Sequence, residues 1–243
     1  MPGRLTGKVA IVTGASAGIG RASALALAAE GARVVITARR QERLDELASE
    51  INAMGTQAYQ IAGDANDEAT AKRCVECALK EEGRIDILLN IAGMGNYKNL
   101  VETSLEEYDQ LMNTNMRTTF IFTRQVVPQM LLQKQGTIIM ISSMAGLYGF
   151  PNQAVYCATK FAQVGFAQSL DKELRPGGIK VGVICPGGVK TEFAIGAGRT
   201  EESVAKSDML EATDVADAVL LACTQAPGSR IIEVQMRTMS ESL

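Results

Sequence analysis

The chain of 243 residues contains no histidine and no tryptophan, and aromatic residues make up only 5% of it. Without histidine there can be no Ser-His-Asp hydrolase, no histidine-based zinc site and no histidine general base. Any acid–base chemistry therefore has to come from other side chains.

The sequence also lacks a strong charge imbalance and a long apolar run. Its net charge is −3 and the basic residues are scattered, which argues against a nucleic-acid-binding surface. No run of about 18 apolar residues is present that could span a bilayer. The opening residues, 1–14, lead into a strand-like segment rather than a secretory signal pattern. We therefore expect a cytoplasmic protein with no membrane and no nucleic-acid partner.

Cysteine is scarce, and its five copies are an odd number for a disulfide framework. This number favours a reducing compartment. Cys74 and Cys77 form one C-x-x-C motif that could in principle be redox-active. They lie within residues 67–83, which have helical periodicity, and no second cysteine pair accompanies them. We interpret them as ordinary helix residues.

Seven apolar runs of strand length recur along the chain and alternate with segments of helical periodicity. The runs cover residues 8–14, 32–38, 56–63, 85–93, 136–143, 179–187 and 230–236. The helical segments begin near Gly18, Gln41, Asp67, Ser104, Asn152 and Thr213. Uniformly apolar strands that alternate with helices pair in parallel through right-handed crossovers. The pattern predicts an α/β fold with a single doubly wound Rossmann-type parallel sheet of about seven strands and helices on both faces.

No linker, repeat or low-complexity tract divides the chain, so we expect one domain over residues 1–243. Two helical segments, roughly 104–134 and 152–175, are longer than the rest and keep apolar residues on their outward faces. Such faces usually have a partner, and we expect a homotetramer, or a homodimer, packed through them. The alternative is that the monomer covers both faces itself.

A glycine-rich turn follows the first predicted strand. Gly14, Gly18 and Gly20 have the spacing T-G-x-x-x-G-x-G and open the first βαβ unit. Here the backbone could approach a pyrophosphate and donate N–H groups at a helix N-terminus. Ser16 could add a hydroxyl to the phosphates, and Ile19 would anchor the turn on the sheet. The sequence thus predicts a dinucleotide site.

The end of the second predicted strand indicates which dinucleotide binds. An NAD site usually has an acidic residue here for the ribose hydroxyls, whereas this chain has Ala38 followed by Arg39 and Arg40. One charge-assisted contact to a 2′-phosphate contributes about 1.5–3 kcal/mol, enough for tenfold selectivity or more. We expect NADP to be preferred over NAD through Arg39. Arg40 could be only solvated, and either arginine could be a surface charge.

Ligands of open α/β sheets lie beyond the carboxyl ends of the strands, so the residues that follow the strands are candidate site residues. Asp64 could contact the adenine edge, and Ser142 is interpreted as a strand-end hydroxyl. The other candidates are Asn90, Ala92, Gly93, Ser143, Pro186, Gly187, Val189 and Thr191. Tyr156 and Lys160 open the helix after the fifth strand and share one helix face. Alone, that pair could be an amphipathic surface pair.

Six motifs in order resemble those of the short-chain dehydrogenase/reductase family and cover nearly the whole chain. They are T-G-x-x-x-G-I-G at residues 13–20, N-x-A-G at 90–93, Asn115, Ser143 thirteen residues before Tyr156, Y-x-x-x-K at 156–160 and P-G-x-V-x-T at 186–191. The resemblance implies a catalytic tetrad of Asn115, Ser143, Tyr156 and Lys160, with hydride transfer at the nicotinamide C4.

The chemistry of this pair can also be argued from pKa values. A free phenol has a pKa near 10, so its use as a base near neutral pH needs a depression of about 3 units, or roughly 4 kcal/mol. Lys160, one helical turn away, and the oxidised nicotinamide are the positive charges available. In reduction, Tyr156 would give its proton to the carbonyl oxygen while Ser143 holds that oxygen. Lys160 would also hold the hydroxyls of the nicotinamide ribose. Asn115 would support a chain of water molecules that resupplies the proton.

The resemblance weakens at three places. Ala17 stands where some NADP-using relatives carry a basic residue, and Ile91 replaces the second asparagine of N-N-A-G. The ending, residues 230–243, lacks the V-D-G-G of many oxoacyl-thioester reductases and looks more like the branch with 3-hydroxy acid dehydrogenases and broad-range carbonyl reductases.

The substrate is expected to be a small to medium carbonyl or alcohol compound with an apolar part. Residues 189–210 should form a short mobile lid, and apolar side chains from the lid and from two strand ends should line the pocket. They are Phe193, Ile195, Met209 and Leu210 on one side, and Met94, Met144, Leu147, Tyr148 and Phe150 on the other. They could equally be lid packing.

Three functional hypotheses remain open on the sequence. The first is an NADPH-dependent carbonyl reductase that is reversible as an alcohol dehydrogenase. A variant of this first hypothesis is a 3-oxoacyl-thioester reductase. The second hypothesis is a non-catalytic regulator that senses NADP(H). The third is an NAD-dependent epimerase or dehydratase, which normally needs a further domain for which 243 residues leave no room.

Overall fold

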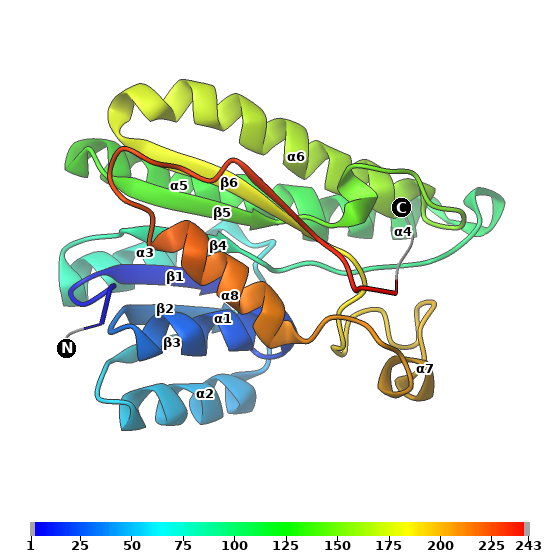
Figure 1. Ribbon diagram of the computed structural model, residues 1–243, viewed down its shortest axis with the longest axis horizontal. Coiled ribbons are helices and arrows are strands. Elements are labelled where there is room, and N and C mark those ends of the chain that lie inside the picture. The colour runs from blue at the N-terminus through cyan, green and yellow to red at the C-terminus, as the bar shows by residue number, and fades with distance from the viewer. Residues whose placement is uncertain (1–2, 241–243) are drawn as a thin grey trace.

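Seven strands form one parallel sheet in the order β3-β2-β1-β4-β5-β6-β7 (Figure 1). The computed structural model describes residues 3–240; residues 1–2 and 241–243, which belong to the opening and closing segments considered above, lie outside the described residues. The strands are β1 (Val9–Thr13), β2 (Arg33–Ala38), β3 (Ala58–Ala62), β4 (Ile87–Asn90), β5 (Gly136–Ile141), β6 (Ile179–Pro186) and β7 (Glu233–Met236). The predicted strands and their parallel pairing are confirmed.

Helices cover both faces of the sheet, as the alternating pattern predicts. One face is packed by α1 (Gly18–Ala29), α2 (Gln41–Ala53) and α8 (Ala212–Cys223). The other is packed by α3 (Glu68–Glu82), α5 (Thr118–Gln133) and α6 (Ala154–Leu174). Two shorter helices, α4 (Leu105–Met112) and α7 (Glu201–Ala205), and three 3₁₀ turns, η1 (Leu100–Glu102), η3 (Met144–Gly146) and η4 (Arg175–Gly177), lie outside these layers. Side chains of the strands alternate between the two cores because neighbouring residues of a strand face opposite ways.

The segment predicted as one helix over residues 104–134 is interrupted. Ser104 begins α4 with a capping box to Glu107, and the chain then passes through a π-helical turn, η2 (Asn113–Arg117), before α5. Such turns insert an extra residue into the helix and are often found at functional sites. Hydrophobic periodicity does not reveal this insertion, which places Asn115 fully inside the protein.

Cys74 and Cys77 both lie in α3, a helix that starts at the Asp67 cap and ends at the left-handed Gly83. Burial raises the pKa of the Cys74 thiol to about 12 and also raises that of Cys77. Thiols held in the protonated form are poor nucleophiles. The structure therefore supports their interpretation as ordinary helix residues.

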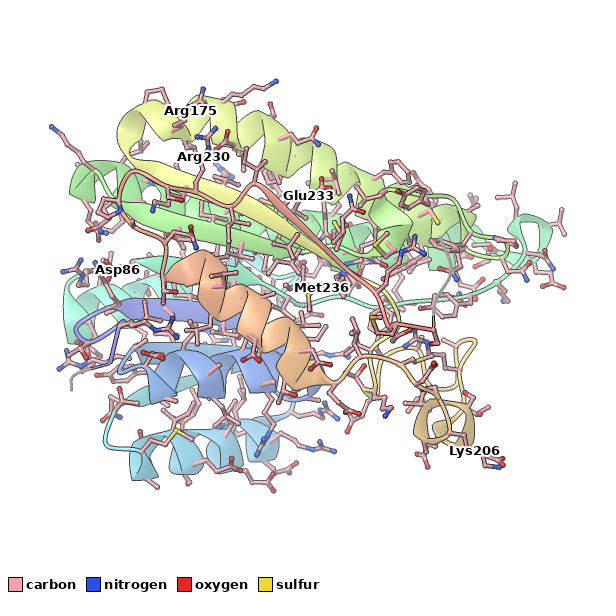
Figure 2. The ribbon with its side chains drawn as sticks, in the orientation of Figure 1. Asp86, Arg175, Lys206, Arg230, Glu233 and Met236 are labelled. Carbon is pink, nitrogen blue, oxygen red and sulfur yellow. The ribbon has the colours of Figure 1, made fainter. Side chains whose placement is uncertain are left out.

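The two ends of the sheet differ in character. Asp86 lies at the end where the strands start, opposite α7 and its Lys206 (Figure 2). It is buried, and its carboxylate accepts hydrogen bonds from Arg84, Lys8 and the Val9 N–H. Burial alone would raise the pKa of Asp86, but these bonds hold it below its usual value. This end carries a structural ion network, and the carboxyl ends of the strands carry the candidate site.

Candidate active site

The glycine turn after β1 brings three backbone segments together more closely than side chains would allow. A Cβ added to Gly20 would lie 2.2 Å from the Gly14 carbonyl oxygen, and one added to Gly14 would lie 2.9 Å from the Ala92 nitrogen. At Gly18, whose φ is +51°, it would lie 2.7 Å from a Thr191 methyl carbon. The turn is therefore packed against the end of β4 and against the segment that follows β6.

The first helix begins in a way that suits an anion. The N–H groups at the start of α1 receive no side-chain cap from Ala17, and the first turn contains no acidic residue. Uncapped N–H groups and the positive end of the helix dipole attract phosphate. With the bare glycines before it, this helix start fits the pyrophosphate of a dinucleotide.

Thr13, at the end of β1, holds the loop that follows β4. Its hydroxyl oxygen accepts hydrogen bonds from the Ile91 and Ala92 N–H groups at 2.9 and 3.1 Å and donates to the Leu89 carbonyl at 3.1 Å. Thr13 thereby joins the glycine turn to the N-x-A-G motif. The two lie after β1 and β4, neighbouring strands from which the sheet continues to β2 on one side and to β5 on the other.

The two arginines after β2 differ in their contacts. Arg40 donates to the Ser16 hydroxyl at 3.1 Å and pairs with Glu192 at 2.7 Å, while Arg43 contacts the other Glu192 oxygen at 3.0 Å. Hydrogen bonding from Arg40 lowers the pKa of Glu192. Arg39 is exposed, and no hydrogen bond or ion pair ties it to another described residue. Arg40 is thus more than the solvated side chain that the sequence left open, since it connects the glycine turn to residues 189–210.

Tyr156 and Lys160 are both buried at the start of α6. The Lys160 Nζ lies 5.7 Å from the centroid of the Tyr156 ring. It donates to the Ile141 carbonyl of β5 at 3.0 Å and to the Gln163 amide oxygen at 2.9 Å. The ammonium is therefore held between a strand end and its own helix, beside the phenol.

Asn115 ties the π-helical turn to the loop after β4. Its side chain accepts from the Met94 N–H at 2.7 Å and donates to the Met94 carbonyl at 2.9 Å and to the Thr159 hydroxyl at 3.0 Å. Its main-chain oxygen accepts from the Gln163 amide at 3.0 Å and from the Thr119 hydroxyl at 2.9 Å. The side chain of Asn115 is therefore fully engaged by the fold.

Two aromatic rings cover Tyr156. The centroid of the Tyr97 ring lies 5.8 Å from that of Tyr156 in an edge-to-face arrangement, and that of Phe193 lies 5.9 Å away. The Arg199 guanidinium lies beyond both rings, 5.6 Å from the Tyr97 centroid and 6.0 Å from the Phe193 centroid. Tyr156 is consequently only 5% exposed.

Burial controls the ionisation of the pair. It is the main cause that raises the pKa of the Tyr156 phenol, and the Ser143 hydroxyl and Arg199 act in the opposite direction. Burial also lowers the pKa of Lys160 to about 8. Both groups are pushed toward their neutral forms, because ionisable side chains are removed from water here. For Tyr156 this direction is opposite to the lowered phenol pKa that the sequence argument requires.

Residues 189–210 form a closed excursion from the end of β6. Val189 pairs with Leu210, and the Lys190 and Leu210 N–H groups donate to the Leu210 and Gly188 carbonyls at 2.8 and 2.9 Å. Beside this closure, a cavity of about 340 Å³ is lined by Gly188, Asp208, Met209, Thr238 and Ser240. The excursion carries α7, and it places Phe193 against Tyr156 and Arg199 over the Phe193 ring.

The remaining predicted site residues differ in how far they are buried and in what they contact. Asn90 is buried, and its amide donates to Thr123 in α5 at 3.0 Å. Met144 is buried and packs in the core beneath α5 and α6. Tyr148 is exposed and lies under Arg237. Asp64 follows β3, where its carboxylate accepts from the Asn66 N–H.

The last predicted residues lie around the same edge. The Ser143 hydroxyl oxygen accepts a hydrogen bond from the Ala145 N–H at 3.1 Å. Phe150 packs in the same apolar cluster as Tyr156. Gly187 donates its N–H to the Met236 carbonyl at 2.8 Å, directly after Pro186 ends β6. A Cβ on Gly93 would lie 3.1 Å from the Asn115 amide oxygen and 3.8 Å from the Lys160 Nζ.

Sequence reasoning did not find four residues of this site: Tyr97, Gln163, Glu192 and Arg199. Gln163 carried a signal, because it lies three residues after Lys160 on the same helix face. The other three are in loops without periodicity. Within residues 3–240, no group of three or more Cys, Asp or Glu side chains could hold a metal ion.

Comparisons with known proteins agree with this geometry. A family model described as short chain dehydrogenase matches residues 8–202. An uncharacterized oxidoreductase of Staphylococcus epidermidis is 35% identical over 230 residues, 95% of this chain and 96% of the relative. The 3-oxoacyl-acyl-carrier-protein reductase of Thermotoga maritima is 37% identical over 188 residues, 77% of this chain and 76% of the relative. A metagenomic short-chain oxidoreductase crystallised with NADP has a TM-score of 0.84 and 35% identity, with 98% and 100% of the two chains covered.

Proposed function

The chain belongs to the short-chain dehydrogenase family of oxidoreductases, and from this premise we propose that it is an NADP(H)-dependent carbonyl reductase that also works in reverse as an alcohol dehydrogenase. The observation that carries the proposal is the burial of Tyr156 beside the Lys160 ammonium, with 5.7 Å between Nζ and the ring centroid. The pair lies at the same sheet edge as the bare glycine turn and the uncapped start of α1.

The residues fit an NADP cofactor. Gly14, Gly18 and Gly20 make the turn before α1 compact, and the uncapped N–H groups at the start of α1, with the Ser16 hydroxyl, are the groups that would hold a pyrophosphate. Arg39 and Arg40 follow β2 and are the cations that would bind a 2′-phosphate. Among the described residues, two donors of Lys160 have partners, which leaves a third N–H for ribose hydroxyls. When bound, NADP(H) supplies or accepts the hydride. The metagenomic relative solved with NADP supports this choice.

The acid–base roles follow from the positions of the side chains. In reduction, the Tyr156 hydroxyl gives its proton to the substrate oxygen, and the Ser143 hydroxyl donates a hydrogen bond to the same oxygen. In oxidation, Tyr156 must lose its proton, and the Lys160 ammonium stabilises the phenolate that forms. Asn115 holds the π-helical turn against the loop after β4 and so keeps the pocket wall in place.

Residues 189–210 act as the lid of this site. Phe193 and Tyr97 lie on the Tyr156 ring, so a substrate reaches the hydroxyl only if these rings move aside. The excursion is closed at its base by the Val189–Leu210 pairing, and opening it would also break the exposed Arg40–Glu192 ion pair and the hydrogen bond from the Tyr97 N–H to the Ala197 carbonyl. A small to medium carbonyl compound with an apolar part suits this site, because Phe193 and Phe150 belong to the apolar cluster that contains Tyr156.

A 3-oxoacyl-thioester reductase is the second candidate. The named Thermotoga maritima relative favours it, with 37% identity over 188 residues. Its match covers about three quarters of the chain, whereas the ending of this chain departs from the V-D-G-G pattern. We therefore place the free carbonyl substrate first.

The assembly and location remain proposals from the sequence. Large apolar side chains are exposed on α5 and α6, among them Phe120 and Phe161, and a homotetramer or homodimer would cover them. Among the described residues, no helix is both long and apolar enough to cross a membrane. We propose a cytoplasmic enzyme.

The test is turnover of NADPH and NADH, followed by loss of their absorbance, with a panel of aldehydes, diketones, 3-oxo acids and a 3-oxoacyl thioester. We expect NADPH to be oxidised at least about tenfold more efficiently than NADH, as one charge-assisted phosphate contact allows. Tight NADPH binding without turnover of any substrate would contradict the proposal and favour a non-catalytic NADP(H) sensor. Selective turnover of the thioester would favour the second candidate.

A further inference from the structure

We propose that Arg199 binds a carboxylate of the substrate, so that the enzyme prefers short oxo acids, and the corresponding hydroxy acids in reverse. This inference rests on the proposed function and names its substrate class. Arg199 is half-buried in the 189–210 excursion, and it contacts the Tyr97 and Phe193 rings, both of which pack on Tyr156.

The partners of Arg199 leave much of its hydrogen-bonding capacity unused. A guanidinium has five N–H donors arranged to match a carboxylate. The Val189 carbonyl accepts one of them at 3.4 Å, and the Tyr97 hydroxyl also interacts with the group. Within residues 3–240, no carboxylate forms an ion pair with Arg199, whereas Arg40 and Arg43 share Glu192.

The surroundings strengthen the attraction of Arg199 for an anion. Aromatic faces stabilise a cation but do not accept its N–H groups in the plane where a carboxylate would bind. Arg199 contacts the same two rings that pack on Tyr156, and its charge favours the deprotonated phenol. This arrangement suits a short substrate that carries a carboxylate as well as the reacting carbonyl, such as a 3-oxo acid.

The reaction itself is unchanged by this contact. The carbonyl carbon gains a hydride from NADPH, its oxygen gains the Tyr156 proton, and the carboxylate passes through unaltered. The product is a hydroxy acid and NADP⁺, and Tyr156 regains its proton from solvent. Arg199 therefore contributes binding and orientation only.

The experiment compares 3-oxobutanoate with its methyl ester in the wild type, in Arg199→Met and in Arg199→Lys. We expect Arg199→Met to lower kcat/KM for the acid by roughly 10- to 100-fold, mainly through KM, because a hydrogen bond to a charged group contributes about 1.5–3 kcal/mol. The ester should change less than about threefold, and Arg199→Lys should retain part of the preference. Equal losses for acid and ester, or a wild type that prefers the ester, would overturn the inference.

A control and a second readout separate this inference from the proposed function. Lys206→Met removes a positive charge from the same excursion, directly after α7, where Lys206 pairs with Glu202 on the surface (Figure 2). It should leave both substrates unaffected. If neither these two compounds nor any other carbonyl compound of the panel is turned over, the proposed function fails, but calorimetry of 3-hydroxybutanoate binding to the NADP⁺-loaded protein still tests Arg199. Binding lost in Arg199→Met supports the inference, and unchanged or absent binding refutes it.

A separate observation carries a second inference: we infer that Gln163 is a positioning residue for Lys160. Gln163 is 1% exposed, and its amide lies between the Lys160 ammonium and the Asn115 main-chain oxygen. Because that carbonyl can only accept, the amide nitrogen must face it, and the amide oxygen is left to face Lys160. The orientation is thus imposed by the partners.

This arrangement supports the charged form of Lys160. Burial disfavours the ammonium, and the Gln163 and Ile141 oxygens, at 2.9 and 3.0 Å, are the acceptors that offset this cost. Removing the Gln163 oxygen would favour neutral lysine. The Tyr156 phenolate would then lose its stabilising charge, and a higher pH would be needed to form it.

Gln163→Met tests this role because methionine has a similar shape and no hydrogen-bonding groups. We expect the acidic limb of kcat/KM for alcohol oxidation to move up by about one pH unit, since one lost hydrogen bond to a charge is equivalent to about one to two pKa units. Gln129→Met is the matched control, because Gln129 bonds to Gln133 on α5, away from Lys160.

If Gln163 had a purely structural role, Gln163→Met would lower the thermal unfolding midpoint but leave the acidic limb of the kcat/KM profile at the same pH. That result would overturn the inference. A second measurement does not need turnover. The Tyr156 phenol can be titrated by ultraviolet difference absorbance in the NADP⁺-loaded protein, with Tyr156→Phe as the blank. Its apparent pKa should rise in Gln163→Met, and an unchanged value would equally refute the role.

Discussion

The surroundings of Lys160 and those of Arg40 lie at the same edge of the sheet but are held in opposite ways. Lys160, Gln163 and Asn115 are 4%, 1% and 0% exposed, and their polar groups are bonded to one another and to the backbone. Arg40 and Glu192 pair across the surface with side chains that are 44% and 49% exposed.

This difference indicates which part of the site is built by folding and which part is left for a ligand to rearrange. Breaking a buried polar network costs several kcal/mol because its members cannot turn to water. An exposed ion pair contributes only about 0–1 kcal/mol and weakens in salt. The surroundings of Lys160 are therefore rigid. The Arg40–Glu192 pair, by contrast, could open if a phosphate competed for the arginine.

The largest expected effect is at the centre of the buried region. Tyr156→Phe keeps the ring that packs on Tyr97 and Phe193 but removes the only proton that the proposal uses. We expect kcat to fall by about 10²–10⁴-fold, the usual contribution of a positioned acid. NADPH affinity, measured by fluorescence titration, should hardly change. Substantial turnover by this variant would mean that another group acts as the acid.

The next effect concerns the cost of burying Lys160. Its pKa of about 8 in the fold lies below the value of 10.5 expected when unfolded, so the unfolded chain binds more protons between these pH values. Stability from this group therefore rises with pH across that window. The stability of Lys160→Met relative to the wild type should fall by roughly 3 kcal/mol from pH 8 to pH 10.5, measured by urea unfolding. A difference independent of pH would show that the lysine is not strained by burial.

A smaller effect is expected at the exposed region. Arg39→Asp and Arg40→Asp should each shift the kcat/KM ratio toward NADH by about tenfold or more, because a carboxylate repels the 2′-phosphate and can bind ribose hydroxyls. The two variants also separate the arginines, since Arg40 alone already contacts the glycine turn through Ser16. An unchanged ratio in both would remove them from cofactor selection.

The smallest effect should come from Glu192, which pairs with Arg40 and Arg43 and, on our proposal, would compete with the 2′-phosphate for them. Glu192→Gln should tighten NADPH binding about two- to fivefold and leave NADH binding unchanged, as expected for exposed ion pairs. The gain should shrink as salt is added. Equal changes for both dinucleotides would indicate a general effect on residues 189–210 rather than competition.

Much of the fold could be predicted because its signals are local. Apolar runs such as residues 136–143 and the glycine turn at residues 13–20 are legible from neighbouring residues alone, and the strands, helices and parallel sheet follow from them. The pairing of Tyr156 with Lys160 is equally local, as one helical turn joins them. The π-helical turn was not predictable, because its extra residue leaves no mark in the hydrophobic period.

The sequence by itself determined the doubly wound sheet, the glycine turn after β1 and the presence of a tyrosine and a lysine on one helix face, since each depends on short spacings. Only the tertiary structure decided what surrounds them. The Arg40–Glu192 pair joins residues 152 positions apart, and the Gln163–Asn115 bond joins residues 48 positions apart. Such contacts form when the strands bring distant loops to one edge of the sheet, and no local pattern records which side chains will then meet.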